Sequence, residues 1–177
     1  MALSTSEIKR QPSYKWGAIS YIIALIVILL AFAFEYVGGY KACELCIQQR
    51  YSYYLGIPIL FIALLFVGLE KRGLAITLFL LTSLIFLLNV FLGSYHAGIE
   101  WGFWDGSTTC NYARHQHLVE NNEGILALLQ EMPTTSCGHV AWRFLGLSFA
   151  GWNVISSLIL TICCIRAASS YNLIYTN

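Results

Sequence analysis

The sequence predicts an all-α membrane protein built as a four-helix transmembrane bundle. Of its 177 residues, 58% are hydrophobic and only 11% are charged, whereas a soluble domain usually has about 25% charged residues. Four apolar stretches approach the length of about 20 residues that a helix needs to cross a bilayer. Because a helix satisfies its backbone polar groups within one segment, these stretches favour a single membrane domain over residues 1–177. The net charge of +1 leaves no basic surface for a nucleic acid.

The first predicted span covers residues 16–34, which contain no charged residue. A basic segment precedes it, and Ala31-Phe32-Ala33 has the small-x-small pattern of a signal-peptidase site. The apolar run is long for a signal peptide, and Glu35 followed by Tyr36 is an ordinary helix exit. We therefore expect a retained helix, with cleavage as the alternative.

The other predicted spans cover residues 51–69, 74–95 and 144–165. Pro58 lies early in the second span, where neighbouring helices of a bundle satisfy the backbone group that it frees. Tyrosines at the start of the second span and tryptophans at the start of the fourth are typical of the aromatic belts of membrane proteins.

Basic residues near the span ends predict the orientation. Six lie in the tails and in the short loop between the second and third spans: Lys9, Arg10, Lys15, Lys71, Arg72 and Arg166. Four lie in the longer loops of the opposite side: Lys41, Arg50, Arg114 and Arg143. We therefore expect both termini in the cytoplasm and outer loops at 35–50 and 96–143. Within the second loop, the apolar residues 125–129 flanked by Glu123 and Glu131 predict a short amphipathic helix on the membrane surface.

Four of the six cysteines fall in the outer loops. Cys43 and Cys46 have the C-x-x-C spacing of dithiol redox motifs. Cys46 is expected in or beside the first turn of a helix, where the helix dipole favours a thiolate, and Arg50 follows it by one turn. A low-pKa thiolate is what disulfide exchange requires. This pattern favours redox chemistry, with a structural disulfide or half of a zinc site as alternatives.

The remaining cysteines and His96 are less specific. Cys110 and Cys137 each follow a stretch of small and polar residues in the second outer loop, where a flexible backbone is expected. This favours a labile disulfide over a structural one. Cys163 and Cys164, in the fourth span, are interpreted as small hydrophobic residues. From the residues alone, His96 is a hydrogen-bonding side chain at the membrane interface.

Several segments together resemble the disulfide bond formation protein B (DsbB) family. They are CELCIQQR at the start of the second span, YHAGIE after the third, Cys110, Cys137, and WRFLGLS before the fourth. In their order and topology they extend over nearly the whole chain.

The resemblance implies a quinone-dependent protein-dithiol oxidoreductase of the bacterial inner membrane, with both loops in the periplasm. Members reoxidise a periplasmic thioredoxin-fold protein, DsbA, and pass the electrons to ubiquinone or menaquinone. On this chain, Cys110 and Cys137 would form the disulfide that DsbA attacks, and Cys110 would form the mixed disulfide. Electrons would then reach Cys43 and Cys46.

The resemblance also implies the quinone site. Cys46 would contact the quinone as a thiolate, Arg50 would stabilise that complex, and His96 would contact the quinone. Two other classes remain as alternatives. One is a four-span structural or binding protein with two inert disulfides. The other is a vitamin K epoxide reductase type protein, in which the C-x-x-C lies in the final helix rather than before the second.

Overall fold

The structure, a computed structural model, describes residues 12–39, 42–104 and 143–173. Its elements, in order, are α2 (Pro12–Tyr36), α3 (Glu44–Gly68), α4 (Arg72–Glu100), β1 (Arg143–Phe144), β2 (Leu147–Ser148) and α7 (Phe149–Leu173). The four helices are each long and apolar enough to cross a membrane. The predicted four-helix membrane bundle is therefore confirmed.

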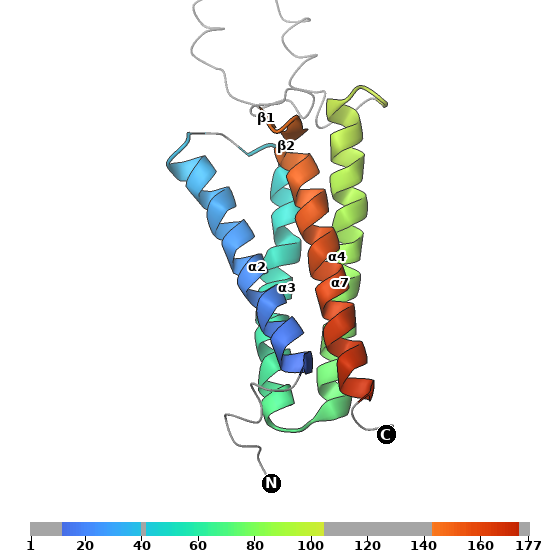
Figure 1. The fold of residues 1–177 in the computed structure, drawn as a ribbon. Coiled ribbons are helices and arrows are strands. Elements are labelled where there is room, and N and C mark those ends of the chain that lie inside the picture. The colour runs from blue at the N-terminus through green and yellow to red at the C-terminus, as the bar shows by residue number, and fades with distance from the viewer. Residues whose placement is uncertain (1–11, 40–41, 105–142, 174–177) are drawn as a thin grey trace, which may run out of the picture.

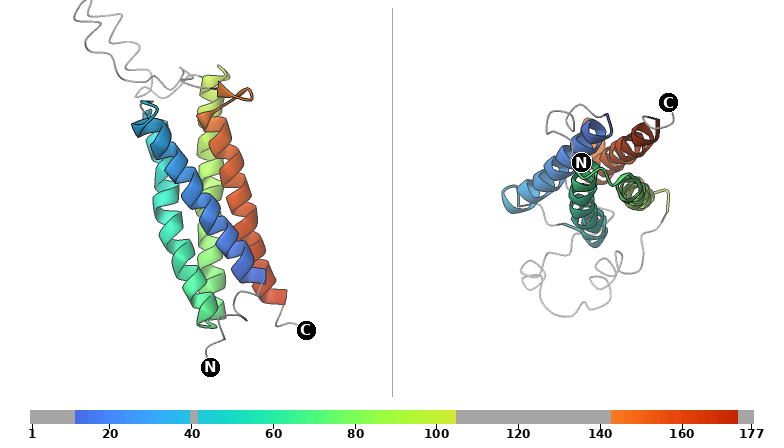
Figure 2. Two further views of the ribbon diagram at one scale, coloured as in Figure 1. Left: turned by 60° about the vertical axis from the view of Figure 1, so that its left-hand side comes forward. Right: turned by 90° about the horizontal axis from the view of Figure 1, so that it is seen from below.

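The helices close into a bundle in which each packs against two neighbours. α3 and α7 both pack against α4, and both also pack against α2. α2 is inclined to the other three helices, as Figure 2 shows. The start of α2, the turn between α3 and α4 and the end of α7 all lie at the lower end of the bundle in Figure 1. The start of α3 and the end of α4 therefore meet at the upper end.

Apolar side chains fill the interior and also cover the outside. Phe79, Phe86, Leu60 and Leu160 are fully buried in the core. Long aliphatic side chains such as Leu29 and Leu88 are about 60% exposed on the outer faces. In lipid such exposure has no hydrophobic cost, because the surrounding acyl chains are as apolar as leucine.

The fourth helix begins later than predicted, at Phe149 instead of residue 144. Leu145 and Gly146 have positive φ angles of 53° and 81°, which a helix does not accommodate and a two-residue hairpin turn requires. β1 and β2 therefore pair as an antiparallel hairpin. Ser148 then caps the helix, because its hydroxyl accepts a hydrogen bond from the Gly151 N–H at 3.2 Å.

The other three helices also extend beyond the predicted spans, and α2 covers Pro12–Tyr36 rather than 16–34. α3 begins at Glu44, seven residues before the predicted start, and α4 continues to Glu100, five residues past the predicted end. Hydropathy marks only the apolar part of a helix, and residues 44–50 contain no glycine or proline that would end one. The first outer loop is thus shorter than predicted. The predicted surface helix at residues 125–129 lies outside the described residues.

Candidate functional site

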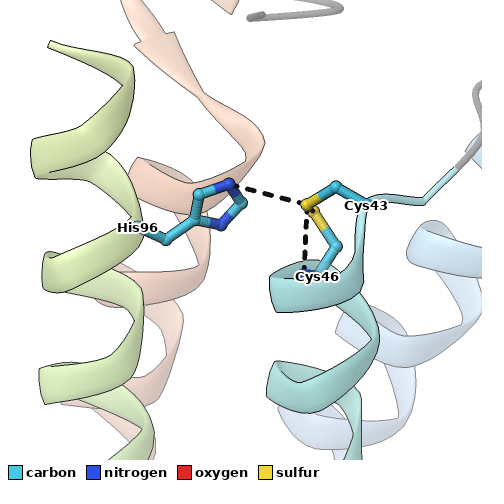
Figure 3. A group of neighbouring side chains, drawn as sticks. All are labelled: Cys43, Cys46 and His96. Carbon is cyan, nitrogen blue, oxygen red and sulfur yellow. Dashed lines mark hydrogen bonds between the residues drawn. The ribbon is translucent and has the colours of Figure 1, made fainter. Parts of the chain in front are cut away.

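Cys43 and Cys46 lie together at the amino-terminal end of α3 (Figure 3). Cys43 is the N-cap residue, and its sulfur accepts a hydrogen bond from the backbone N–H of Cys46 at 3.2 Å. The two Sγ atoms are 2.8 Å apart and hydrogen-bonded. The spacing produces this geometry, because the backbone N–H three residues after an N-cap is free and faces the capping side chain. The pair is therefore positioned to interconvert between dithiol and disulfide.

His96 reaches the cysteines from the facing helix α4 (Figure 3). Its Nε2 atom is 3.6 Å from the Cys43 sulfur, across a sequence separation of 53 residues. The side chain is only 2% exposed. His96 is thus a hydrogen-bonding side chain, as the residues alone predicted, and the structure adds that the ring is buried and is a partner of the cysteine pair.

The contacts of Cys43 favour its thiolate. They lower its pKa from the ordinary value of 9.0 to about 4, and the largest cause is the hydrogen bond with the Cys46 thiol. Burial opposes the shift, while His96 and the Cys46 N–H add to it. The position of Cys46 in the sequence predicts that the helix terminus favours its thiolate. In the reduced pair the thiolate is favoured on Cys43 instead, chiefly because its sulfur is hydrogen-bonded to the Cys46 thiol, with the free backbone N–H of Cys46 as a smaller contribution.

Buried amide groups continue from His96 into the bundle. Gln49 Nε2 lies 2.9 Å from His96 Nδ1. Asn153 Nδ2 donates to Gln49 Oε1 at 2.6 Å, and the Tyr53 hydroxyl donates to Asn153 Oδ1 at 2.8 Å. Of these three residues, sequence reasoning missed Gln49 and Asn153 and placed Tyr53 in an aromatic belt, which is wrong because Tyr53 is buried in the bundle. A signal was present for two of them, because Cys46, Gln49 and Tyr53 follow one another at helical spacing on one face.

Glu100 lies one turn after His96 on α4 and contacts it. One carboxylate oxygen is 3.9 Å from His96 Nε2, and the side chain is 7% exposed. The other oxygen accepts a hydrogen bond from the Ser148 hydroxyl of the hairpin. The hairpin therefore holds the end of α4 next to the cysteine pair.

Arg50 lies one turn after Cys46 on α3 and contacts α2. Its guanidinium forms an ion pair with Glu35, and its central carbon lies 5.4 Å from the centre of the Phe32 ring. The side chain remains 15% exposed. Sequence reasoning identified Arg50 but not the acidic partner that fixes it.

The other cysteines divide into two groups. Cys110 and Cys137 lie outside the described residues. Cys163 and Cys164 are buried in α7, where Cys164 belongs to the apolar core together with Ala167 and Ala168. Their surroundings agree with the interpretation of this pair as small hydrophobic residues.

A metal ion would also find three donors here. The ligand atoms of Cys43, Cys46 and His96 all lie within 4.8 Å of one another. Two thiolates on a tetrahedral zinc ion are separated by about 3.8 Å, given Zn–S bonds of about 2.3 Å. The sulfurs here are 2.8 Å apart, which is too close for that geometry and favours the dithiol interpretation.

Four membrane-spanning helices and a C-x-x-C pair held against a buried histidine define a membrane protein with thiol–disulfide chemistry. The model of the family described as "Disulfide bond formation protein DsbB" matches residues 14–167. The chain therefore belongs to the DsbB family, as its sequence motifs predicted. It is a multi-pass membrane protein of disulfide bond formation, and this family implies a disulfide-forming oxidoreductase.

Three relatives illustrate the similarity. A Rickettsia prowazekii (strain Madrid E) protein named "Uncharacterized protein RP370" is 28% identical over 140 residues, 79% of this chain and 78% of its own length. The "Disulfide bond formation protein B" of Azoarcus sp. (strain BH72) is 27% identical over 149 residues, 76% of this chain and 81% of its own. The "Disulfide bond formation protein B" of Paracidovorax citrulli (strain AAC00-1) is 26% identical over 164 residues, which are 84% of this chain and 86% of its own length. No solved structure matches the chain significantly.

Proposed function

We propose that this protein reoxidises a DsbA-type thioredoxin-fold protein and passes the electrons to a membrane quinone, thereby supporting disulfide formation in secreted proteins. The observation that carries the proposal is the Cys43 and Cys46 pair, whose sulfurs are 2.8 Å apart beside His96 at one end of a membrane bundle. A thiolate is the reactive form in disulfide exchange, and the contacts of Cys43 favour a thiolate.

Two cysteine pairs share the work in this proposal. Resemblance to the family assigns Cys110 and Cys137 to the disulfide that the reduced partner attacks, with Cys110 forming the mixed disulfide. The partner leaves oxidised, and Cys110 and Cys137 become thiols. These thiols then reduce the disulfide between Cys43 and Cys46. Oxidation of Cys43 and Cys46 back to a disulfide releases two electrons and two protons, which balances the reduction of one quinone to its quinol.

The residues around the pair suit a quinone, which is a flat apolar ring with two carbonyl acceptors. Arg50 supplies a cationic donor, and Phe32 stacks on Tyr54 beside it with ring centres 6.4 Å apart. Cys46 is partly exposed, whereas Cys43 is buried. These features support contact of Cys46 and Arg50 with the quinone. A thiolate on Cys46 is proposed from the family resemblance alone, because the contacts of the reduced pair favour the thiolate on Cys43. Because His96 is buried behind Cys43, its contact with the quinone is proposed at the inner edge of the site.

The proposed location is the bacterial inner membrane, with both termini in the cytoplasm. The cysteine pair then faces the periplasm, where disulfides persist. The distribution of basic residues supports this orientation. The fold is compatible with it, because the start of α2, the end of α7 and the α3–α4 turn share the end of the bundle opposite the cysteine pair.

The test follows quinone absorbance in detergent after adding a reduced DsbA-type protein. Wild-type protein is expected to reduce ubiquinone or menaquinone, and Cys46→Ser and Cys110→Ser are each expected to abolish turnover. Cys163→Ala is the matched control, because Cys163 is buried in α7 away from the site, and it should retain turnover.

Each other outcome has a defined meaning. Loss of turnover with Cys46→Ser but not with Cys110→Ser would remove the second pair from the mechanism. No turnover of either quinone by folded wild-type protein would contradict the proposal and favour a four-span protein with inert disulfides.

A further inference from the structure

We propose that Gln49 and Asn153 are positioning residues of the cysteine pair: they hold His96 in the tautomer whose ring proton is on Nε2, directed at the Cys43 sulfur. The inference deepens the proposed function and rests on it, because it assigns a role in preparing Cys43 for disulfide exchange.

The amide of Gln49 determines which ring nitrogen accepts. Its Nε2 lies 2.9 Å from His96 Nδ1, and an amide nitrogen is only a donor. A neutral imidazole has one donor and one acceptor nitrogen. Nδ1 is therefore the acceptor, and the single ring proton lies on Nε2. That nitrogen is 3.6 Å from the Cys43 sulfur.

Asn153 keeps the Gln49 amide from turning over. Its Nδ2 donates to Gln49 Oε1 at 2.6 Å, so rotation of the Gln49 amide would bring two donors together. Asn153 is fixed in turn, because its Oδ1 accepts from the Tyr53 hydroxyl at 2.8 Å and from Asn89 Nδ2 at 3.5 Å. The oxygen and the nitrogen of the Gln49 amide, and those of the Asn153 amide, are therefore each assigned by a different neighbour.

Because these amide and hydroxyl groups are buried, a change in their hydrogen bonds costs free energy. Gln49, Tyr53 and Asn89 are at most 4% exposed. At such depth an unpaired polar group costs about 1–3 kcal/mol, so the alternative tautomer, which would set two donors or two acceptors against each other, is disfavoured. These hydrogen-bonded side chains connect α3, α4 and α7. The orientation of the His96 ring therefore depends on the packing of three helices.

The groups around Cys43 make the position of the ring proton important. Among the described residues, the titratable groups that act on Cys43 are Cys46 on α3 and His96 on α4, and Glu100 on α4 contacts His96. α7 contributes the neutral Asn153, and on α2 Glu35 is paired with Arg50. A proton on Nε2 stabilises negative charge on the Cys43 sulfur. With the proton on Nδ1 instead, the Nε2 lone pair would face that sulfur and oppose a thiolate.

The test uses full-length protein in detergent, reduced, with ¹⁵N-labelled histidine. NMR distinguishes the protonated from the unprotonated ring nitrogen, and the His96 signals are assigned by their loss in His96→Asn. A second measurement is the pH dependence of Cys43 alkylation, read on the peptide by mass spectrometry. The variants are Gln49→Glu, which replaces the donor by an acceptor, Gln49→Met, which removes both groups at similar volume, and Asn153→Leu.

The matched control is Thr82→Val. Thr82 is also fully buried on α4, but its hydroxyl donates to Leu78 O of its own helix. It lies 14 residues from His96, about 21 Å along the helix axis. This variant should change neither measurement.

The expected result is an unprotonated Nδ1 in the wild type and a protonated Nδ1 in Gln49→Glu. The alkylation midpoint of Cys43 should rise by about one pH unit or more in Gln49→Met and Asn153→Leu, a tenfold loss of thiolate below the midpoint. A protonated Nδ1 in the wild type would overturn the inference without any variant, and so would an unchanged midpoint in folded Gln49→Met. Failure of wild-type quinone reduction would instead contradict the proposed function and leave the tautomer result intact.

Discussion

The bundle contains two pairs of cysteines close in sequence, and their surroundings are opposite. Cys43 and Cys46 lie at the start of α3, hydrogen-bonded to each other, to a free backbone N–H and to His96. Cys163 and Cys164 lie well inside α7, buried at 5% and 0% exposure. Cysteine content therefore does not identify a reactive site, whereas position along the helix does.

The difference follows from helix geometry. At a helix start the first N–H groups have no partner within the helix, so a sulfur at the N-cap receives one. Inside a helix every N–H is already bonded to a carbonyl, and adjacent residues do not face each other. Residues three apart at a terminus thus form a reactive pair, and neighbouring residues in mid-helix form part of the packing.

The largest expected effect on quinone turnover comes from replacing one cysteine of each pair. Cys43→Ser should reduce quinone turnover by more than about 10³-fold, because no disulfide can then form with Cys46. Cys164→Ala should leave turnover within about twofold of the wild type, since Cys164 lies in the buried core of the bundle and not at the cysteine pair. Steady-state quinone reduction with a reduced DsbA-type protein measures both. Equal losses in the two variants, both folded, would abolish the contrast.

A second prediction concerns the pH dependence of stability. The pKa of Cys43 is depressed from 9.0 to about 4 in the folded, reduced protein, so its thiolate contributes stability that is fully present above about pH 9 and is lost as the pH falls toward 4. As the pH rises from about 4 to about 9, the free energy of unfolding of the reduced protein should therefore increase relative to that of the oxidised protein. Unfolding in mixed detergent, with the two redox forms compared at each pH, measures the difference.

Cys164→Ala serves as the control for this experiment. It should preserve the pH-dependent difference, whereas Cys43→Ser should remove it. A difference between the redox forms that is flat across this pH range would contradict the assignment of the thiolate to Cys43.

Alanine substitutions at two glycines test whether helices pack more closely near the site than at the opposite end of the bundle. A Cβ on Gly93 would lie 2.8 Å from a methyl group of Val154, whereas a Cβ on Gly73 would meet nothing within 4 Å. Gly93→Ala should destabilise the protein by about 1–3 kcal/mol through overpacking between α4 and α7. Gly73→Ala should stabilise it by up to about 1 kcal/mol through helix propensity. Unfolding midpoints in mixed detergent measure both, and equal shifts would contradict the close approach at Gly93.

The four helices and their order could be predicted because hydropathy and span length act locally along the chain. The C-x-x-C pair and its position near a helix start were also predictable from spacing. The hairpin before α7 was not, because Leu145 adopts a positive φ that composition does not indicate. The contact between Cys43 and His96 and the role of Asn153 depend on the packing of α3, α4 and α7. A polar residue in an apolar run signals a buried partner but does not name it.

The smallest expected effect comes from neutralising one acidic residue at each end of the bundle. Glu35 pairs with Arg50 near the cysteines, while Glu70 is exposed in the turn at the opposite end. Glu35→Gln should raise the KM for quinone by up to about fivefold with kcat unchanged, because a partly exposed ion pair contributes about 0.2–1 kcal/mol. Glu70→Gln is the matched control and should change neither constant. A fall in kcat with Glu35→Gln would mean that Glu35 acts on the sulfurs themselves, whereas a change in KM alone would confine it to orienting Arg50.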